Sequence, residues 1–123
     1  MSKEKITFEE FETIIENSVN ALPKKFKDIL DKNHIKLIPR DDLPESIRSK
    51  YPGKVVFGIF IGVPYGRFFH VATEPTRIEL YKKSFEKVFD DPDEIREQII
   101  KTVIHEIGHY FGFSEEAIRK LGY

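Results

Sequence analysis

One short motif near the C-terminus constrains this chain more than any other feature. It reads HExxHxxGxxE, from His105 to Glu115. On an α-helix, residues four apart lie on one face and one turn apart. His105 and His109 can therefore bind one ion together, while Glu106 projects from the flank of the same face. Gly112 can take the left-handed conformation that ends a helix, and this turn would return Glu115 toward the histidines.

Two imidazoles and a carboxylate are one of the usual ligand sets of catalytic zinc, and they leave a further position for water. The motif therefore predicts that His105, His109 and Glu115 hold Zn²⁺. Zinc lowers the pKa of a bound water toward about 7, and Glu106 would take its proton as general base and deliver it to a leaving amine. The alternative interpretation is a surface helix that carries these side chains by coincidence.

Other residues near such a site have less specific signals. Tyr65, Tyr81 and His70 are candidates for stabilising the negative charge on a substrate carbonyl oxygen, with core or loop packing as the alternative for each. His34 is expected to be exposed at the start of a strand. Gly108 lowers helix propensity by about 1 kcal/mol relative to Ala. A closely approaching backbone would explain this glycine, and simple tolerance is the alternative.

Composition excludes several classes of protein. The chain has 20 basic and 21 acidic residues, a net charge of −1, so no electrostatic footprint favours nucleic acid or an anionic membrane. Cysteine is absent, so a metal must be held by His, Asp and Glu. No apolar run approaches the roughly 20 residues that span a bilayer, and no signal peptide is apparent. We expect one cytoplasmic domain over residues 1–123.

Apolar periodicity predicts helices toward both ends of the chain. The stretch from Thr7 to Ala21 is amphipathic, and Thr7 with Glu10 forms a capping box. Pro23 opens a second short helix that ends near Leu30.

The motif lies on the last long helix. Asp91 is its expected N-cap, Pro92 its first residue and Phe111 its end. Most of its circumference is apolar, but one polar stripe consists of Gln98, Thr102, His105 and His109, flanked by Glu106. A purely structural helix has no reason to carry that stripe. Ser114 can cap a final helix, Glu115 to Leu121.

The middle of the chain predicts short strands. These are residues 35–38, ended by Pro39, residues 55–61, and residues 77–81. Gly58 indicates a bulge or a close backbone approach. The sequence predicts loops at residues 40–54 and 62–76. For residues 82–89 the pattern is ambiguous and fits a turn and a short helix.

The segment from Asp91 to Tyr123 resembles the short bacterial zincin-like metallopeptidase family, a minimal domain distantly similar to matrix metalloproteinases. Shorter upstream similarities extend the resemblance over nearly the whole chain: residues 8–11, 22–23, 57–60, 62–64 and 77–81. The resemblance implies a minimal zincin α+β fold, in which a small mixed β-sheet packs against an N-terminal helix and the HExxH helix. It also implies that residues 55–61 form an edge strand beside the cleft, where an extended peptide could add as another strand.

The same resemblance implies roles for individual residues. His105 and His109 correspond to ligands, Glu106 to the base and Glu115 to the third ligand. Members of this family commonly carry Asp at that last position, and the larger metzincins carry His. The methionine turn of metzincins has no counterpart, because Met1 is the only methionine.

The leading prediction is a zinc-dependent metallopeptidase that acts on a peptide or protein substrate, without a nucleic-acid or membrane partner. A second hypothesis is a non-catalytic or regulatory domain that binds metal weakly or not at all. A third is a zinc-dependent ribonuclease, because a ribonuclease family shares a related HxxxHxxGxxH pattern. The near-neutral charge and the presence of Glu106 disfavour the third.

Overall fold

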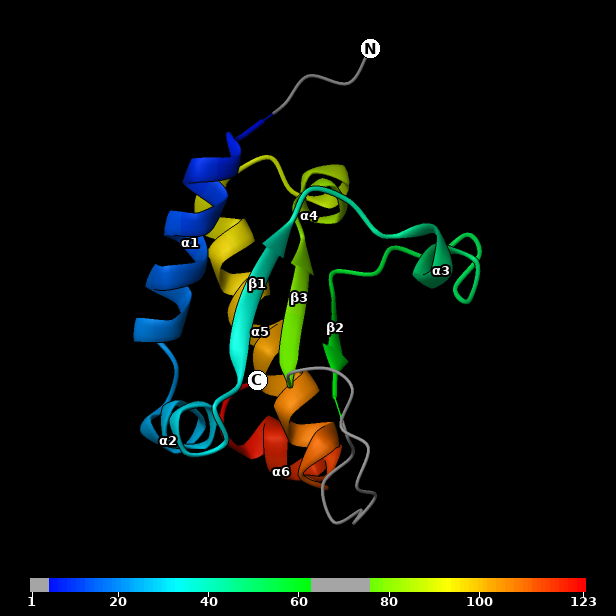
Figure 1. The fold of residues 1–123 in the computed structure, drawn as a ribbon. Coiled ribbons are helices and arrows are strands. Elements are labelled where there is room, and N and C mark those ends of the chain that lie inside the picture. The colour runs from blue at the N-terminus through cyan, green and yellow to red at the C-terminus, as the bar shows by residue number, and fades with distance from the viewer. Residues whose placement is uncertain (1–4, 63–75) are drawn as a thin grey trace.

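The computed structural model describes residues 5–62 and 76–123, with the elements arranged as in Figure 1. The helices are α1 (Phe8–Asn20), α2 (Lys24–Lys32), α3 (Glu45–Arg48), α4 (Lys82–Val88), α5 (Pro92–Tyr110) and α6 (Glu115–Lys120). The strands are β1 (Lys36–Arg40), β2 (Gly58–Ile61) and β3 (Arg77–Tyr81). The predicted loop at 62–76 lies outside the described residues, apart from its two ends.

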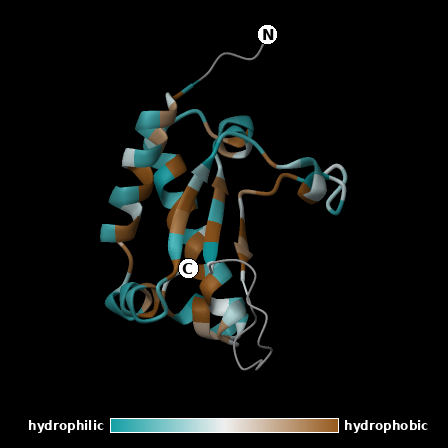
Figure 2. Cartoon of the chain, in the orientation of Figure 1, coloured by the Kyte–Doolittle hydropathy of each residue, from teal (hydrophilic) through white to brown (hydrophobic). Residues whose placement is uncertain are grey.

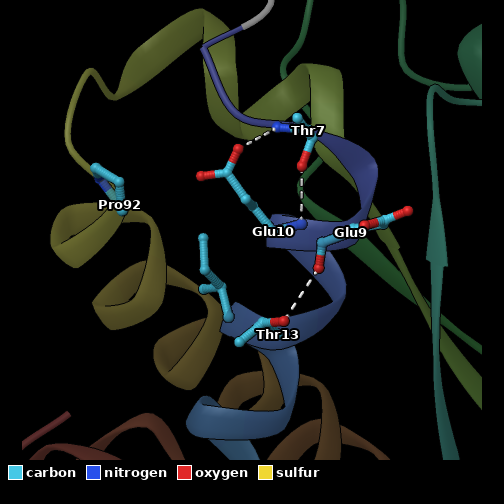
Figure 3. A pocket seen from close by; sticks show the side chains of 6 residues that line it. Thr7, Glu9, Glu10, Thr13 and Pro92 are labelled. Atoms are coloured by element: carbon cyan, nitrogen blue, oxygen red, sulfur yellow. Dashed lines mark hydrogen bonds between the residues drawn. The ribbon is translucent and has the colours of Figure 1, made fainter.

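Helix α1 begins at its predicted cap. The Thr7 hydroxyl accepts a hydrogen bond from the Glu10 N–H at 3.0 Å, and the Thr7 N–H donates to the Glu10 carboxylate at 2.9 Å (Figure 3). This is the expected capping box. Hydrophobic and hydrophilic residues alternate around α1 (Figure 2), and its buried face, with Phe11 and Ile15, packs against α5.

The strands form one mixed sheet in the order β1-β3-β2. Strand β1 is parallel to β3, and β2 is antiparallel to it. Ile78 and Leu80 of β3 are fully buried in the core that the sheet shares with α1 and α5. The structure therefore confirms the predicted α+β fold, and β2 is an edge strand among the strands that the structure describes, as expected.

Strand β1 does not end before Pro39 as predicted. It runs from Lys36 through Pro39 to Arg40. Among the described strands β1 pairs only with β3, so it is an edge strand of this sheet. Proline is tolerated in an edge strand, since its missing N–H need not interrupt the ladder.

Strand β2 is shorter than predicted, because residues 55–57 are not part of it. The Tyr81 N–H donates to the Phe57 carbonyl at 2.9 Å, and the next residue, Lys82, already begins α4. Residues 55 and 56 consequently have no residue of β3 to pair with. The stretch at 82–89, which the sequence left open, forms helix α4. The predicted loop at 40–54 contains the short helix α3.

The face of β3 turned away from the helices carries an ionic cluster, because side chains alternate along a strand. Glu79 is only 4% exposed. Its carboxylate accepts hydrogen bonds from Arg77 at 3.0 Å, from Arg40 at 3.2 Å and from the Tyr81 hydroxyl at 3.1 Å. Burial opposes ionisation of Glu79, but these hydrogen bonds outweigh it and hold the pKa of the carboxyl below its ordinary value.

Candidate metal centre and adjoining cleft

Helix α5 fixes the direction of both motif histidines. It begins as predicted, with Asp91 accepting a hydrogen bond from the Asp93 N–H at 2.8 Å and Pro92 in the first turn. Ile99, Val103 and Ile107 lie on its buried face and set its rotation about its own axis. The predicted polar stripe is thereby turned away from the core. None of the helices in residues 5–62 and 76–123, the part that the structure describes, is long and apolar enough to cross a membrane.

The end of α5 reverses the chain. Gly112 has φ of +79°, its N–H donates to the His109 carbonyl at 3.3 Å, and the Phe113 N–H donates to the Gly108 carbonyl at 2.7 Å. This pair of bonds is the Schellman motif, for which glycine is the favoured residue. The Ser114 hydroxyl then accepts from the Ala117 N–H at 3.0 Å. Helix α6 therefore begins with Glu115, as the sequence predicts.

Gly108 lets α6 pack closely against α5, between the two histidines. A Cβ at this position would lie 2.7 Å from Ile118 Cδ1 and 3.3 Å from Ile118 Cγ1. Ile118 is fully buried. The close neighbour is therefore a side chain of α6 and not the closely approaching backbone that the sequence suggested. This packing places α6, and with it Glu115, beside the motif histidines.

The structure brings the predicted ligands together. His109 Nε2 lies 2.8 Å from Glu115 Oε1, and His105 Nδ1 lies 3.7 Å from Glu115 Oε2. One ligand atom from each residue lies within 4.8 Å of the others, and this is the metal-capable group found in the described part of the chain. The hydrogen bond with His109 holds the pKa of Glu115 below its ordinary value, so the carboxylate is ionised at neutral pH.

The group fits zinc in chemistry and in spacing. Imidazole nitrogen and carboxylate oxygen are ordinary zinc ligands, and atoms about 2.1 Å from one tetrahedral ion lie roughly 3.4 Å apart. The separations of 2.8 and 3.7 Å involve the two different oxygens of Glu115, and a set with one ligand atom from each residue lies within 4.8 Å. The three side chains would draw closer together around an ion.

Glu106 adjoins this group on α5. Its side chain is half-buried and lines a cleft together with His105 and His109. Burial raises the pKa of Glu106, and the two histidines only partly offset that effect. A carboxylate with a raised pKa takes up and releases a proton more readily near neutral pH than an ordinary glutamate does.

The cleft itself has a volume of about 450 Å³ and lies between α5 and the segment that leads into β2. It is lined by Tyr51, Lys54, Val55, Val56, Phe57, Gly58, Gln98, Lys101, Thr102, His105, Glu106 and His109. Gly58 marks a close approach and not a bulge, because a Cβ there would lie 2.8 Å from the Glu79 carbonyl and 3.2 Å from Thr102 Cγ2. Tyr51 and Val55 form an apolar wall that is 43% and 47% exposed, respectively.

The sequence predicts the polar stripe on α5 but not the wall of the cleft that lies opposite it. Tyr51 and Lys54 lie in a stretch predicted only as a loop, and no local pattern relates that stretch to α5. The candidate Tyr81 does not line the cleft: it is fully buried and donates its hydroxyl hydrogen to Glu79. Tyr65 and His70 lie outside the described residues. His34 is exposed just before β1, as expected.

Comparison with known proteins identifies the family of the chain independently of this geometry. Residues 35–123 match the model of the family described as zincin-like metallopeptidase. A search of curated proteins found no match. The family match includes all the strands and the whole of the α5–α6 region, and it extends over well more than half of the chain. The chain therefore belongs to the zincin-like metallopeptidase family.

Proposed function

We propose that this protein is a zinc-dependent peptidase whose metal is held by His105, His109 and Glu115, with Glu106 as general base. The observation that carries the proposal is the return of Glu115 across the Gly112 turn to both histidines. The group formed by these three side chains stands beside a cleft, and Glu106 faces the same cleft. A helix that served only packing would need neither this convergence nor the half-buried carboxylate.

The chain's own side chains divide the chemistry between them. Bound zinc supplies Lewis acidity at this end of the cleft. Glu106 takes a proton from the attacking water and passes it to the leaving amine, and its raised pKa suits both steps. Tyr51 and Val55 line the wall of the cleft opposite α5, where they offer apolar surface to a bound substrate.

Strand β2 offers main-chain partners for an extended substrate. Because the Tyr81 N–H donates to the Phe57 carbonyl, residues 57 and 81 form a hydrogen-bonded antiparallel pair. Pairs alternate along such a ladder, so Gly58 and Phe60 direct their N–H and C=O groups toward the open edge. A peptide added there would run beside α5 and the cleft. This supports a peptide or protein as the substrate.

The first test measures zinc. Protein purified without chelators is expected to hold about one zinc per chain by elemental analysis. Glu115→Ala should lose this zinc or bind it much more weakly. The matched control is Glu116→Ala, which removes the neighbouring exposed carboxylate of α6, paired with Lys120 at 3.6 Å, and should keep the metal. Equal zinc content in both variants would contradict the assignment of Glu115.

The second test separates chemistry from metal binding. Glu106→Gln should keep its zinc but lose peptide hydrolysis by about 100-fold or more, because a general base typically contributes that much. His105→Ala should lose both zinc and activity. Cleavage of a peptide library, followed by mass spectrometry, supplies the readout. Full activity of Glu106→Gln would exclude the proposed mechanism.

One observation favours a second candidate function. His109 and Glu115 already contact each other directly at 2.8 Å, so the group is held together without an ion. This contact would suit a non-catalytic domain that keeps the zincin scaffold for binding. Absence of zinc, even after incubation with excess metal, would favour that function over the peptidase.

A further inference from the structure

The cleft extends well beyond the proposed metal ligands. From His105 it continues along α5 past Thr102 and Lys101 to Gln98. Tyr51 and Lys54 line the same cavity from the segment before β2. Apart from His105, none of these residues binds the metal or transfers a proton in the proposed chemistry, although they line the same cavity. This half of the cleft is therefore available to recognise a part of the substrate that does not react.

Two lysines line the cleft, and both carry a positive charge. Lys54 and Lys101 line the cleft with exposed side chains, and neither forms an ion pair with any residue that the structure describes. Glu97, one turn before Lys101, is paired with Arg96 at 3.2 Å. Glu106 is the acidic residue that lines the cleft, and it lies at the metal end. An anionic group of a ligand would thus meet two cations that have no acidic partner among the described residues.

Resting on the peptidase function above, we propose that Lys54 and Lys101 bind a carboxylate of the substrate. Lys101 lies one helical turn from His105, about 6 Å along the axis. An extended peptide covers that distance in roughly two residues. The carboxylate therefore belongs either to an Asp or Glu side chain near the scissile bond or to the C-terminus of a short peptide substrate. Tyr51 and Val55 would contact the apolar part of the same residue.

The test measures binding, so that it does not depend on turnover. Glu106→Gln, loaded with zinc, is titrated against fluorescein-labelled decapeptide pools with amidated C-termini, each with one Asp or one Asn at a scanned position. The Asp pool is expected to bind about fivefold more tightly, as for a partly exposed charge pair, and high salt should reduce the difference. A third pool, with Asn and a free C-terminal carboxylate, distinguishes the two sources of the anion.

Charge reversal provides the decisive variant. In the same Glu106→Gln background, Lys101→Glu should remove the preference for a carboxylate and favour a Lys pool instead. Lys87→Glu is the matched control, because it makes the same change in net charge on α4, at an exposed residue that does not line the cleft. It should keep the preference of the parent protein. An unchanged preference in Lys101→Glu, or equal binding of all pools by the parent, would overturn the proposal.

Hydrolysis by the wild-type chain is then measured on the same pools. A higher kcat/KM for the pool that binds best would extend the preference to catalysis. Selective binding without any cleavage would refute the peptidase function but keep the carboxylate site. Cleavage without selectivity would refute the carboxylate site alone.

Discussion

Gly108 lies between the two histidines, where its missing side chain makes room for Ile118 of α6. We predict that Gly108→Ala destabilises the protein, although alanine favours a helix by about 1 kcal/mol over glycine. The added Cβ would lie 2.7 Å from Ile118 Cδ1, and Ile118 is fully buried, so it has little space to move. Overpacking of this kind costs about 1–3 kcal/mol. The net loss, about 1 kcal/mol, is measurable by urea denaturation.

A second substitution distinguishes this clash from a general defect. Ile118→Val removes Cδ1, the atom nearest to the new Cβ. In the Gly108→Ala background it should therefore recover part of the stability, whereas alone it should lose about 1 kcal/mol. Additive effects in this double-mutant cycle would show that the two residues do not compete for space.

At the scale of single residues, the candidate metal centre was predictable because all its members lie within one local stretch. Helical periodicity places His105 and His109 together, and Gly112 provides the turn that returns Glu115. Tyr51 and Lys54 were not predictable as cleft residues. They meet α5 only through tertiary packing, which no local period encodes. The burial of Tyr81 against Glu79 likewise depends on the other strands.

At the scale of elements, the sheet is stabilised on one face by the ionised Glu79. Its folded-state pKa lies below the ordinary value, so its contribution is present above that value and is lost as the pH falls through the folded-state pKa. We predict that the free energy of unfolding of the wild type falls below about pH 4.5. Glu79→Gln should cost about 1–3 kcal/mol at pH 7 and show a shallower fall in acid.

Arg40→Gln provides an intermediate case, because it removes one of the groups that lower the pKa of Glu79. Its stability in acid should fall less steeply than that of the wild type and more steeply than that of Glu79→Gln. Urea denaturation at several pH values measures all three slopes. Identical slopes for the wild type and Glu79→Gln would show that Glu79 does not control acid stability.

Helices were more predictable than strands. The N-terminal residues of α1 and α5 follow from local capping signals, at Thr7 for α1 and at Asp91 with Pro92 for α5. Strand limits depend on the partner instead. Strand β2 does not include residues 55 and 56 because β3 ends at Tyr81, and β1 includes Pro39 because β1 is an edge strand of the described sheet. Neither fact is a property of the strand's own sequence.

At the scale of the whole molecule, metal binding would connect the long central helix to the C-terminal one. Helix α6 has 6 residues, of which Ile118 is buried. Helices this short are not stable alone in water. Its position therefore depends on the packing of Ile118 and on the contacts of Glu115 with the histidines. A bound ion would add a further link between α5 and α6, and its binding free energy would stabilise the folded chain.

We predict that zinc slows amide hydrogen exchange more in α6 than elsewhere. Helix α4 is the internal comparison, because it is also short, with 7 residues, but it carries no proposed ligand. At a free zinc concentration about 100 times the dissociation constant, the free energy of opening of α6 should rise by up to about 2.7 kcal/mol. Exchange followed by mass spectrometry, with and without zinc, measures both helices in one sample. Glu106→Gln should retain the effect and His109→Ala should lose it. Equal protection of α4 and α6 would mean that the ion does not bridge α5 and α6.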